Sequence, residues 1–166
     1  MFKYFYPDEY VDSSYELDYQ AFYNAGYRAV LFDIDNTLVP HGAPADERAV
    51  QLFEKIRSTG LKACLISNNK LGRVKSFADA VGAFYVEDAH KPSRKGYQRG
   101  MQEMGTTTEN TLFVGDQLFT DVWGAKRTGL KSILVKPINP KEEIQIVLKR
   151  IPERWILHFY RKSREK

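Results

Sequence analysis

The feature that most constrains the fold of this chain is an apolar run that ends in two aspartates. Residues 29–32 are all apolar, and Asp33, Ile34 and Asp35 follow them directly. A short, nearly continuous apolar run is typical of a strand buried on both faces of a parallel sheet. Ligands of such sheets bind outside the carboxyl ends of the strands. Because side chains alternate, Asp33 and Asp35 point to the same face, where two like charges resist ionising together unless a cation lies between them.

A solvated turn after a strand would also explain Asp33 and Asp35. The rest of the chain is needed to decide whether they belong to a ligand site. Four more strands are expected at residues 61–66, 83–86, 111–114 and 131–135. Helices are expected at residues 45–59, 71–81 and 93–104, with another ending at Thr128. The alternation predicts an α/β fold, with three α/β/α layers around a mostly parallel sheet. The glycines form no phosphate-cradling loop, which disfavours a simple nucleotide-binding fold.

Length and composition indicate one globular domain. The chain has 166 residues, of which 43% are hydrophobic and 28% charged. No apolar run reaches the ~18 residues that a membrane-spanning helix needs. Asp8 and Glu9 stand where a signal peptide would be apolar. The single cysteine, Cys64, excludes an internal disulfide and fits a reducing cytosol, so we expect a cytoplasmic protein.

Residues 1–27 form an aromatic N-terminal extension, with ten of the 22 aromatic residues of the chain. Ser13 and Glu16 resemble a capping box, which predicts a helix to about Asn24 that Gly26 closes. The extension could present a membrane or partner-docking face. Packing across the domain is the interpretation that we prefer.

Residues 141–166 form a basic helical C-terminal segment. Residues 149–166 hold seven Lys and Arg against two Glu, so within a total of +4 the other 148 residues sum to −1. A helix is predicted over 141–151, and Pro152, which lacks an N–H, is expected to interrupt it and start another. The apolar positions are Ile144, Val147, Leu148, Ile151, Trp155, Ile156, Phe159 and Tyr160. Either they cover the sheet edge or a subunit contact, or with the basic residues they form a peripheral contact with the inner, anionic face of a membrane.

The predicted strand ends carry residues that suit phosphoryl transfer. They are Asp33 and Asp35, Ser67 and Asn68, Lys91, and Asp116 and Asp121. One carboxylate can take a phosphoryl group as nucleophile, and a second can act as general acid and base. A hydroxyl, backbone N–H groups and a lysine can hold the phosphate oxygens. The remaining carboxylates suit Mg²⁺, which prefers oxygen ligands.

In this order, the residues resemble the four motifs of the haloacid dehalogenase (HAD) superfamily of phosphotransferases. Residues 33–37 resemble the first motif, Ser67 the second, and Lys91 with Pro92 the third. Asp116, after Gly115, and Asp121 resemble the fourth. The resemblance covers about residues 28–135, the expected catalytic core. It implies a Rossmann-like HAD fold and a phosphatase that acts through an aspartyl-phosphate.

The resemblance implies a role for each residue of the first three motifs. Asp33 would be the nucleophile and a Mg²⁺ ligand. Asp35 would be the general acid and base, with its carbonyl also on the metal. Ser67 would bind phosphate through its hydroxyl, helped by the N–H of Asn68. Lys91 would bind phosphate and balance the charge of Asp33.

For the fourth motif, the resemblance makes Asp116 a metal ligand. Asp121 would ligate through water or support the site, although an N-cap of the following helix explains it equally well. The remaining polar residues of these loops are interpreted as loop-shaping rather than functional: Asn36, Thr37, His41, Asn69 and His90.

The spacing between the motifs leaves no room for a cap domain. In this the chain resembles the capless subclass IIIA of the superfamily. More closely, the motifs resemble bacterial phosphatases related to mitochondrial and plastid phosphatidylglycerophosphate phosphatases. The resemblance implies a lipid phosphomonoester substrate at a membrane surface. Its open site would need the substrate, a partner or a second subunit of a homo-oligomer to exclude water.

Two alternatives to a lipid phosphatase stay open. One is a phosphatase of small sugar phosphates or of nucleic-acid ends, although the basic tail is all that favours a nucleic-acid partner. The other is a non-catalytic binding module on the same fold. Intact Asp33, Asp35, Lys91 and Asp116 argue against it.

Overall fold

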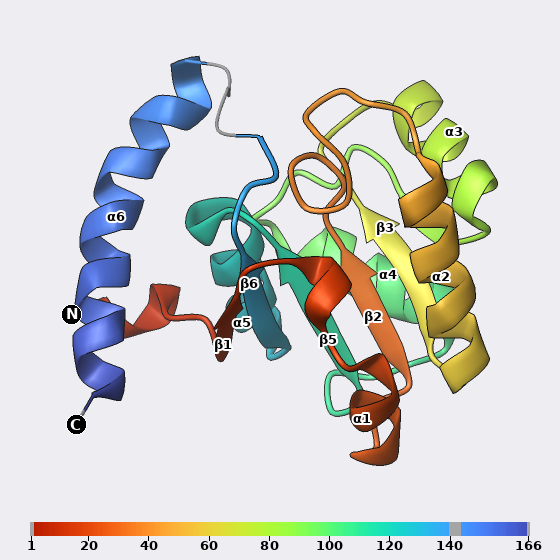
Figure 1. The fold of residues 1–166 in the computed structure, drawn as a ribbon, viewed down its shortest axis with the longest axis horizontal. Helices are drawn as coiled ribbons and strands as arrows, with labels where there is room; N and C mark the ends of the chain where they lie inside the picture. Colours follow the sequence, from red (N-terminus) through yellow and green to blue (C-terminus); the bar gives the residue numbers. More distant parts are fainter. Residues whose placement is uncertain (1, 140–143, 166) are drawn as a thin grey trace.

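Six parallel strands form one sheet in the order β1-β6-β5-β2-β3-β4 (Figure 1). The computed structural model describes residues 2–139 and 144–165. The strands are β1 (Glu9–Val11), β2 (Ala29–Phe32), β3 (Lys62–Ile66), β4 (Phe84–Val86), β5 (Thr111–Gly115) and β6 (Lys131–Val135). The predicted α/β fold is confirmed, and five of these strands lie where the sequence predicts them.

Helices cover both faces of the sheet (Figure 1). They are α1 (Tyr19–Asn24), α2 (Glu47–Thr59), α3 (Leu71–Val81), α4 (Arg94–Met104), α5 (Trp123–Thr128) and α6 (Ile144–Arg164). Along β2, Val30 and Phe32 pack with residues of α1, α2 and α3, whereas Ala29 and Leu31 pack with residues of α4 and α5. This alternation of buried side chains explains why the strand is apolar throughout and confirms the three layers.

The chain leaves the middle of the sheet in two directions. From β2 it proceeds to β3 and β4 at one edge, and from β5 it proceeds to β6 next to β1 at the other. The carboxyl ends of β2 and β5 therefore meet where the strand order reverses, which is where open α/β sheets bind ligands. Asp33 follows β2 and Asp116 follows β5 at this point.

The N-terminal extension belongs to the sheet, which confirms that it packs on the domain. Residues Glu9, Tyr10 and Val11 of β1 pair with Ile133, Leu134 and Val135 of β6. The predicted single helix after Ser13 is wrong, because Ser13 starts only a 3₁₀ turn (Ser14–Glu16). Leu17 is extended, and the carboxylate of Asp18 accepts a hydrogen bond from the N–H of Ala21 to begin α1.

The C-terminal segment forms one helix, α6, so the predicted interruption at Pro152 is wrong. Proline in a helix frees the carbonyl four residues before it, here that of Leu148. Leu148 is 63% exposed, so water can satisfy this carbonyl and the helix continues. Residues 140–143, at the start of the predicted helix, and the side chain of Ile144 lie outside the described residues.

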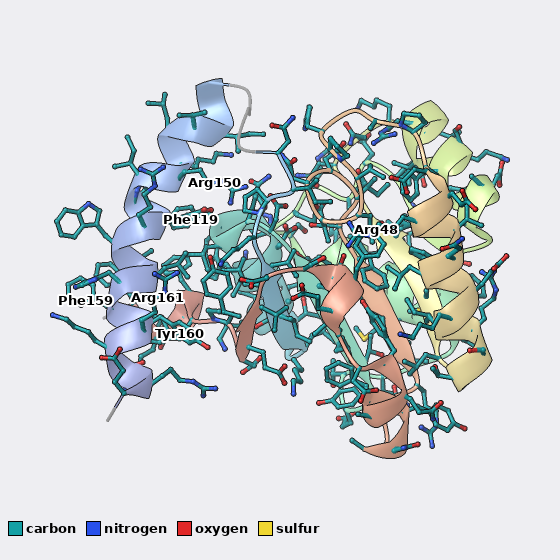
Figure 2. The ribbon with its side chains drawn as sticks, viewed as in Figure 1. Arg48, Phe119, Arg150, Phe159, Tyr160 and Arg161 are labelled. Atoms are coloured by element: carbon teal, nitrogen blue, oxygen red, sulfur yellow. The ribbon has the colours of Figure 1, made fainter. Side chains whose placement is uncertain are left out.

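The apolar residues of α6 divide between two faces. Ile156 and Tyr160 are buried, and Ile156 packs with Leu118, Val122 and Leu134. Trp155 and Phe159 are 65% and 43% exposed, and Figure 2 shows Phe159 on the outer side of α6. Of the eight predicted apolar positions, Ile156 and Tyr160 therefore cover the domain, whereas five are exposed: Val147, Leu148, Ile151, Trp155 and Phe159. Within the described residues, no helix is long and apolar enough to cross a membrane.

Candidate active site

The loops after β2, β3, β4 and β5 bring the predicted site residues together. A pocket of about 190 Å³ lies at these strand ends. Five predicted residues line it: Asp33, Asp35, Ser67, Asn68 and Lys91. Asp116 and Asp121 are both buried. Asp121 accepts hydrogen bonds from Lys91 Nζ and from the N–H of Asp116, so the four motifs form one connected site.

Lys91 lies at the centre of the site, between two carboxylates. Its Nζ is 2.6 Å from Oδ1 of Asp33 and 2.6 Å from Oδ1 of Asp121, and its side chain is only 4% exposed. Burial alone would lower the pKa of Lys91, but the charges of Asp121 and Asp33 outweigh burial and raise it. The two carboxylates therefore favour the cationic form of Lys91, which holds both of them in place.

The two carboxylates on this lysine form a buried cluster with a third, that of Asp116. One oxygen from each of Asp33, Asp116 and Asp121 lies within 4.8 Å of the others. Burial, followed by the charge of Asp121, raises the pKa of Asp33 from 3.8 to about 6. Burial and the charges of Asp33 and Asp121 raise the pKa of Asp116 as well. This repulsion is what a bound cation relieves, so the three oxygens could hold a metal ion.

The sequence left the role of Asp121 open, either as part of the site or as the N-cap of the following helix. Asp121 lies inside a π-helix (Leu118–Val122), and the N-cap of α5 is Val122, so the N-cap interpretation is wrong. Its Oδ2 accepts hydrogen bonds from the N–H groups of Asp116 and Gln117, each at 3.1 Å. A Cβ on Gly115 would lie 2.6 Å from this carboxylate. Only glycine at position 115 lets Asp121 approach the strand end.

Asp35 lies in the pocket but its carboxylate is held apart from the acidic trio. It accepts hydrogen bonds from the N–H of Gly42 at 2.7 Å, from Asn69 Nδ2 at 2.6 Å and from Arg73 at 3.0 Å. Burial would raise the pKa of Asp35, but the Gly42 hydrogen bond and the Arg73 charge together lower it. These contacts favour the ionised form of Asp35, and its side chain is not part of the possible metal cluster.

Ser67 and Asn68 form the part of the pocket that follows β3. The hydroxyl of Ser67 accepts hydrogen bonds from the N–H and the side-chain amide of Asn69, both at 3.1 Å. The side chain of Asn68 binds the backbone of Lys91, with Oδ1 accepting from the Lys91 N–H at 2.7 Å. These contacts fix the loops after β3 and β4 relative to each other.

Sequence reasoning assigned several site residues to loop shaping alone. Thr37 donates to Oδ2 of Asp33 at 3.2 Å and lies 3.3 Å from Oδ1 of Asp116, so it links two motifs. Asn69 holds both Asp35 and Ser67. His41 lines the pocket, whereas Asn36 turns the chain with a φ of 61°. In the sequence, the position of Thr37 two residues after Asp35 is the feature that could have indicated its contact with Asp33 and Asp116.

The C-terminal helix reaches the site, which the sequence did not indicate. Arg150 binds Oδ2 of Asp116 at 2.6 Å and the carbonyl of Asp116 at 2.7 Å. Glu153, which is buried, accepts a hydrogen bond from Arg150 at 2.9 Å and from the N–H of Leu118 at 3.0 Å. Figure 2 shows Arg150 on the side of α6 toward the sheet.

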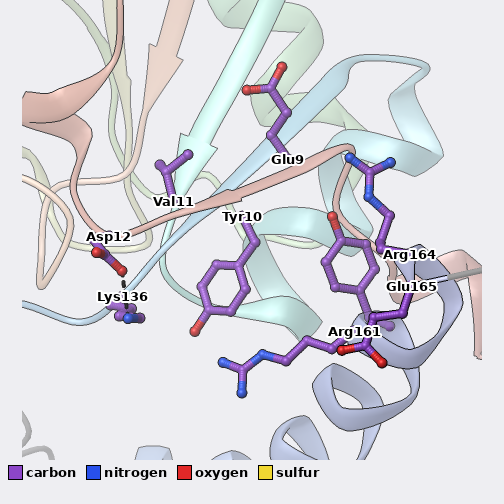
Figure 3. A pocket seen from close by; sticks show the side chains of 9 residues that line it. Glu9, Tyr10, Val11, Asp12, Lys136, Arg161, Arg164 and Glu165 are labelled. Atoms are coloured by element: carbon purple, nitrogen blue, oxygen red, sulfur yellow. Dashed lines mark ion pairs between the residues drawn. The ribbon is translucent and has the colours of Figure 1, made fainter.

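A larger hollow, of about 600 Å³, lies between β1 and the end of α6 (Figure 3). Its lining holds three acidic and three basic residues, and Lys136 pairs with Asp12 at 2.5 Å. None of the predicted site residues lines it. Without excess charge or a nucleophile beside a base, it offers no arrangement for phosphoryl transfer, and we place the chemistry in the smaller pocket.

The smaller pocket combines a carboxylate on a buried lysine with an acidic cluster, at the point where a parallel sheet reverses its strand order. Fold and site together define the class of phosphohydrolases. Comparison with known proteins then gives the family. The chain belongs to the haloacid dehalogenase-like hydrolases, whose family model matches residues 42–129. Asp33 and Asp35 precede the matched range.

Individual relatives agree with this family. The chain is 34% identical over 156 residues to probable phosphatase YqeG of Bacillus subtilis, an alignment that covers 93% of this chain and 91% of that protein. It is 26% identical over 144 residues to phosphatidylglycerophosphate phosphatase 1 of Arabidopsis thaliana, covering 79% of this chain but only 40% of the relative. The chain is thus a HAD-family phosphatase, which argues against a non-catalytic binding module.

Solved structures show the same fold. A HAD phosphatase from Thermococcus onnurineus superposes with a TM-score of 0.51 at 16% identity, covering 70% of this chain and 89% of that one. An uncharacterized protein from Corynebacterium glutamicum superposes with a TM-score of 0.54 at 17% identity, covering 76% and 93%.

Proposed function

We propose that this phosphatase is a Mg²⁺-dependent phosphomonoesterase that acts through an aspartyl-phosphate on Asp33. The observation that carries the proposal is the 2.6 Å contact of Asp33 with buried Lys91, both of which line the pocket. The carboxylate of Asp33 attacks phosphorus, the bond to the alcohol oxygen breaks, and Asp35, which enters this step protonated, gives this oxygen its proton. Asp35 then takes a proton from the water that hydrolyses the aspartyl-phosphate, which releases phosphate and restores Asp33.

The remaining polar residues bind and orient the phosphoryl group. The hydroxyl of Ser67 and the N–H of Asn68 hold its oxygens, and Lys91 offsets its charge. The contacts that lower the pKa of Asp35 favour its ionised form, which is the form that can accept a proton. The negative charge of a bound phosphoryl group raises this pKa again, as the role of acid requires.

HAD phosphatases generally use a divalent metal, and the acidic trio fits one. Asp33, Asp116 and Asp121 would hold the ion, together with the carbonyl of Asp35, as the family resemblance implies. A set of oxygen donors suits Mg²⁺. When bound, the ion supplies positive charge that stabilises the phosphoryl group during transfer.

The proposed substrate is phosphatidylglycerophosphate or a similar bulky phosphomonoester. The Arabidopsis relative carries the name of this activity, although this chain spans 40% of its length. The structure agrees with a capless subclass IIIA site. One loop and α2 separate β2 from β3, and α3 and β4 separate β3 from Lys91, all within the described residues. A site without a cap domain is accessible to a substrate held in a membrane.

A phosphate-release assay tests this substrate. With Mg²⁺, we expect phosphatidylglycerophosphate in mixed micelles to be hydrolysed with a kcat/KM at least about tenfold above that of any small sugar phosphate, because remote contacts add binding energy. Removal of divalent ions with EDTA should abolish release, and added Mg²⁺ should restore it. Equal rates on lipid and sugar phosphates would favour the sugar-phosphate alternative, and release from DNA ends would favour the nucleic-acid one.

The outer face of α6 supports a peripheral contact with an anionic membrane. Five apolar side chains are exposed along it: Val147, Leu148, Ile151, Trp155 and Phe159. Four basic residues of the same helix are also exposed: Arg154, Arg161, Lys162 and Arg164. A helix that exposes apolar and basic side chains together matches a surface with hydrocarbon below and negative charge above. We propose that this face binds the inner surface of a membrane.

Vesicle sedimentation tests the membrane contact. Replacing Trp155 and Phe159 by Ser should weaken binding to anionic vesicles at least about tenfold, because two apolar side chains lose their burial in lipid. The matched control is Phe84→Ser, since Phe84 is 42% exposed in β4, at one edge of the sheet. Binding that does not depend on vesicle charge or salt concentration would contradict the proposal. So would an equal loss of binding in Phe84→Ser.

A further inference from the structure

The position of α6 over the site is fixed by buried polar contacts. Arg150 is bonded to both the side chain and the carbonyl of Asp116. Glu153, three residues later, accepts a hydrogen bond from the N–H of Leu118 at 3.0 Å. Both contacts are made to the segment that carries the fourth motif. The rotation of α6 about its axis is therefore set by the active site itself.

This rotation places two residues of the first turns of α6 in the wall of the pocket. Ile146 and Lys149 line it, three residues apart and thus on one side of the helix. The other walls hold Asp33, Ser67 and Lys91. The C-terminal helix therefore covers part of the site, which is less open than the motif spacing alone implies.

Lys149 differs from the other lysine of the pocket. The ammonium of Lys91 is buried between Asp33 and Asp121. Lys149 is exposed, and in the described part of the chain no carboxylate forms an ion pair with it. A lysine on a flexible stem at the rim of a phosphate pocket of about 190 Å³ is suited to a second negative charge, a few bonds from the phosphoryl group.

We infer that Lys149 is a specificity-determining residue that binds a second anionic group of the substrate. The inference rests on the proposed phosphomonoesterase and adds a requirement on the alcohol that is released. This alcohol carries a phosphate-type anion close to the scissile ester. The anion is either a phosphodiester, as in a phospholipid headgroup, or a second phosphomonoester, as in a small bisphosphate. Lysine binds both as a point charge.

Three soluble substrates that share a glycerol ester test the inference. Glycerol 3-phosphate lacks a second anion, glycerol 1,3-bisphosphate adds a monoester, and glycerophosphoglycerol phosphate adds a diester. The readout is the kcat/KM for each second-anion substrate divided by that for glycerol 3-phosphate. This ratio cancels losses in folding or chemistry that affect all three substrates. 4-Nitrophenyl phosphate reports phosphatase activity independently.

We expect the wild-type ratio to exceed one, and Lys149→Met to lower it about tenfold because a charge-assisted contact is lost. Lys149→Arg should keep most of the ratio, and Lys149→Glu should bring it below one. The control is Lys55→Met, since Lys55 is exposed on α2 and outside the pocket. The substrate whose ratio falls more in Lys149→Met shows whether the second anion of the natural substrate is a phosphodiester or a phosphomonoester.

Two results would overturn the inference while the phosphatase stands. In one, the wild type hydrolyses 4-nitrophenyl phosphate but shows no preference for a second anion. In the other, the preference survives Lys149→Met. If no substrate is hydrolysed, including 4-nitrophenyl phosphate, the proposed function itself fails.

Discussion

Asp33→Asn is expected to lower phosphate release at least about a thousandfold, since an amide cannot act as the nucleophile. The fold should persist. Lys91 keeps its 2.6 Å contact with Asp121, and the carbonyl oxygen of the new amide can still accept a hydrogen bond from Lys91. Removing one of three buried carboxylates also relieves the repulsion that raises the pKa of Asp116. We therefore expect a melting temperature no lower than that of the wild type.

The measurement pairs turnover of 4-nitrophenyl phosphate with a thermal melt. Asp79→Asn is the matched control, because Asp79 makes an exposed ion pair with Lys75 on α3 and lies outside the pocket. It should leave both readouts unchanged. Turnover of Asp33→Asn above a tenth of the wild-type rate would rule out Asp33 as the nucleophile. A large drop in melting temperature would assign Asp33 a structural role as well.

The parts of the fold that the sequence predicts are those in which apolar residues follow a clear local pattern. The apolar run at residues 29–32 and the buried positions Ala49, Leu52, Phe53 and Ile56 of α2 are local patterns, and the structure places them as expected. The strand ends follow from the same patterns, because parallel strands place their carboxyl ends at one edge. Polar residues immediately after such strands therefore meet in one pocket.

The features of the structure that the sequence does not predict depend on contacts between segments far apart in the chain. β1 has three residues, too few for a period, and is a strand only because β6 offers an unpaired edge. Arg150 lies 34 residues after Asp116, in a segment whose basic charge suggests a solvated or membrane-facing helix. Nothing local distinguishes it from the exposed Arg154 one turn later. Its role follows only from where α6 packs.

Lys91→Met is expected to cost about 3–5 kcal/mol of unfolding free energy near neutral pH, the usual cost of removing one partner from a buried ionic network. Methionine fills a similar volume, so the loss is electrostatic. In the wild type, Lys91 contacts Asp33 and Asp121, both at 2.6 Å. Without it, Asp33, Asp116 and Asp121 remain within 4.8 Å, and Arg150 is the cation bonded to this trio in the described residues.

The deficit of Lys91→Met should grow with pH. Even with Lys91 present, the pKa of Asp33 is raised from 3.8 to about 6. Loss of the lysine raises it further, so the folded chain binds more protons than the unfolded chain above about pH 4. Folding is then destabilised as pH rises through this window. Urea unfolding at pH 5 and pH 8 should show the smaller deficit at pH 5.

Two further measurements separate this account from simple loss of packing. Lys75→Met removes a lysine from an exposed ion pair and should change stability little at either pH. A divalent cation should stabilise Lys91→Met more than the wild type, because it restores positive charge to the acidic trio. A deficit that is equal at pH 5 and pH 8, and that added cation leaves unchanged, would show that Lys91 stabilises the site through its packing and not its charge.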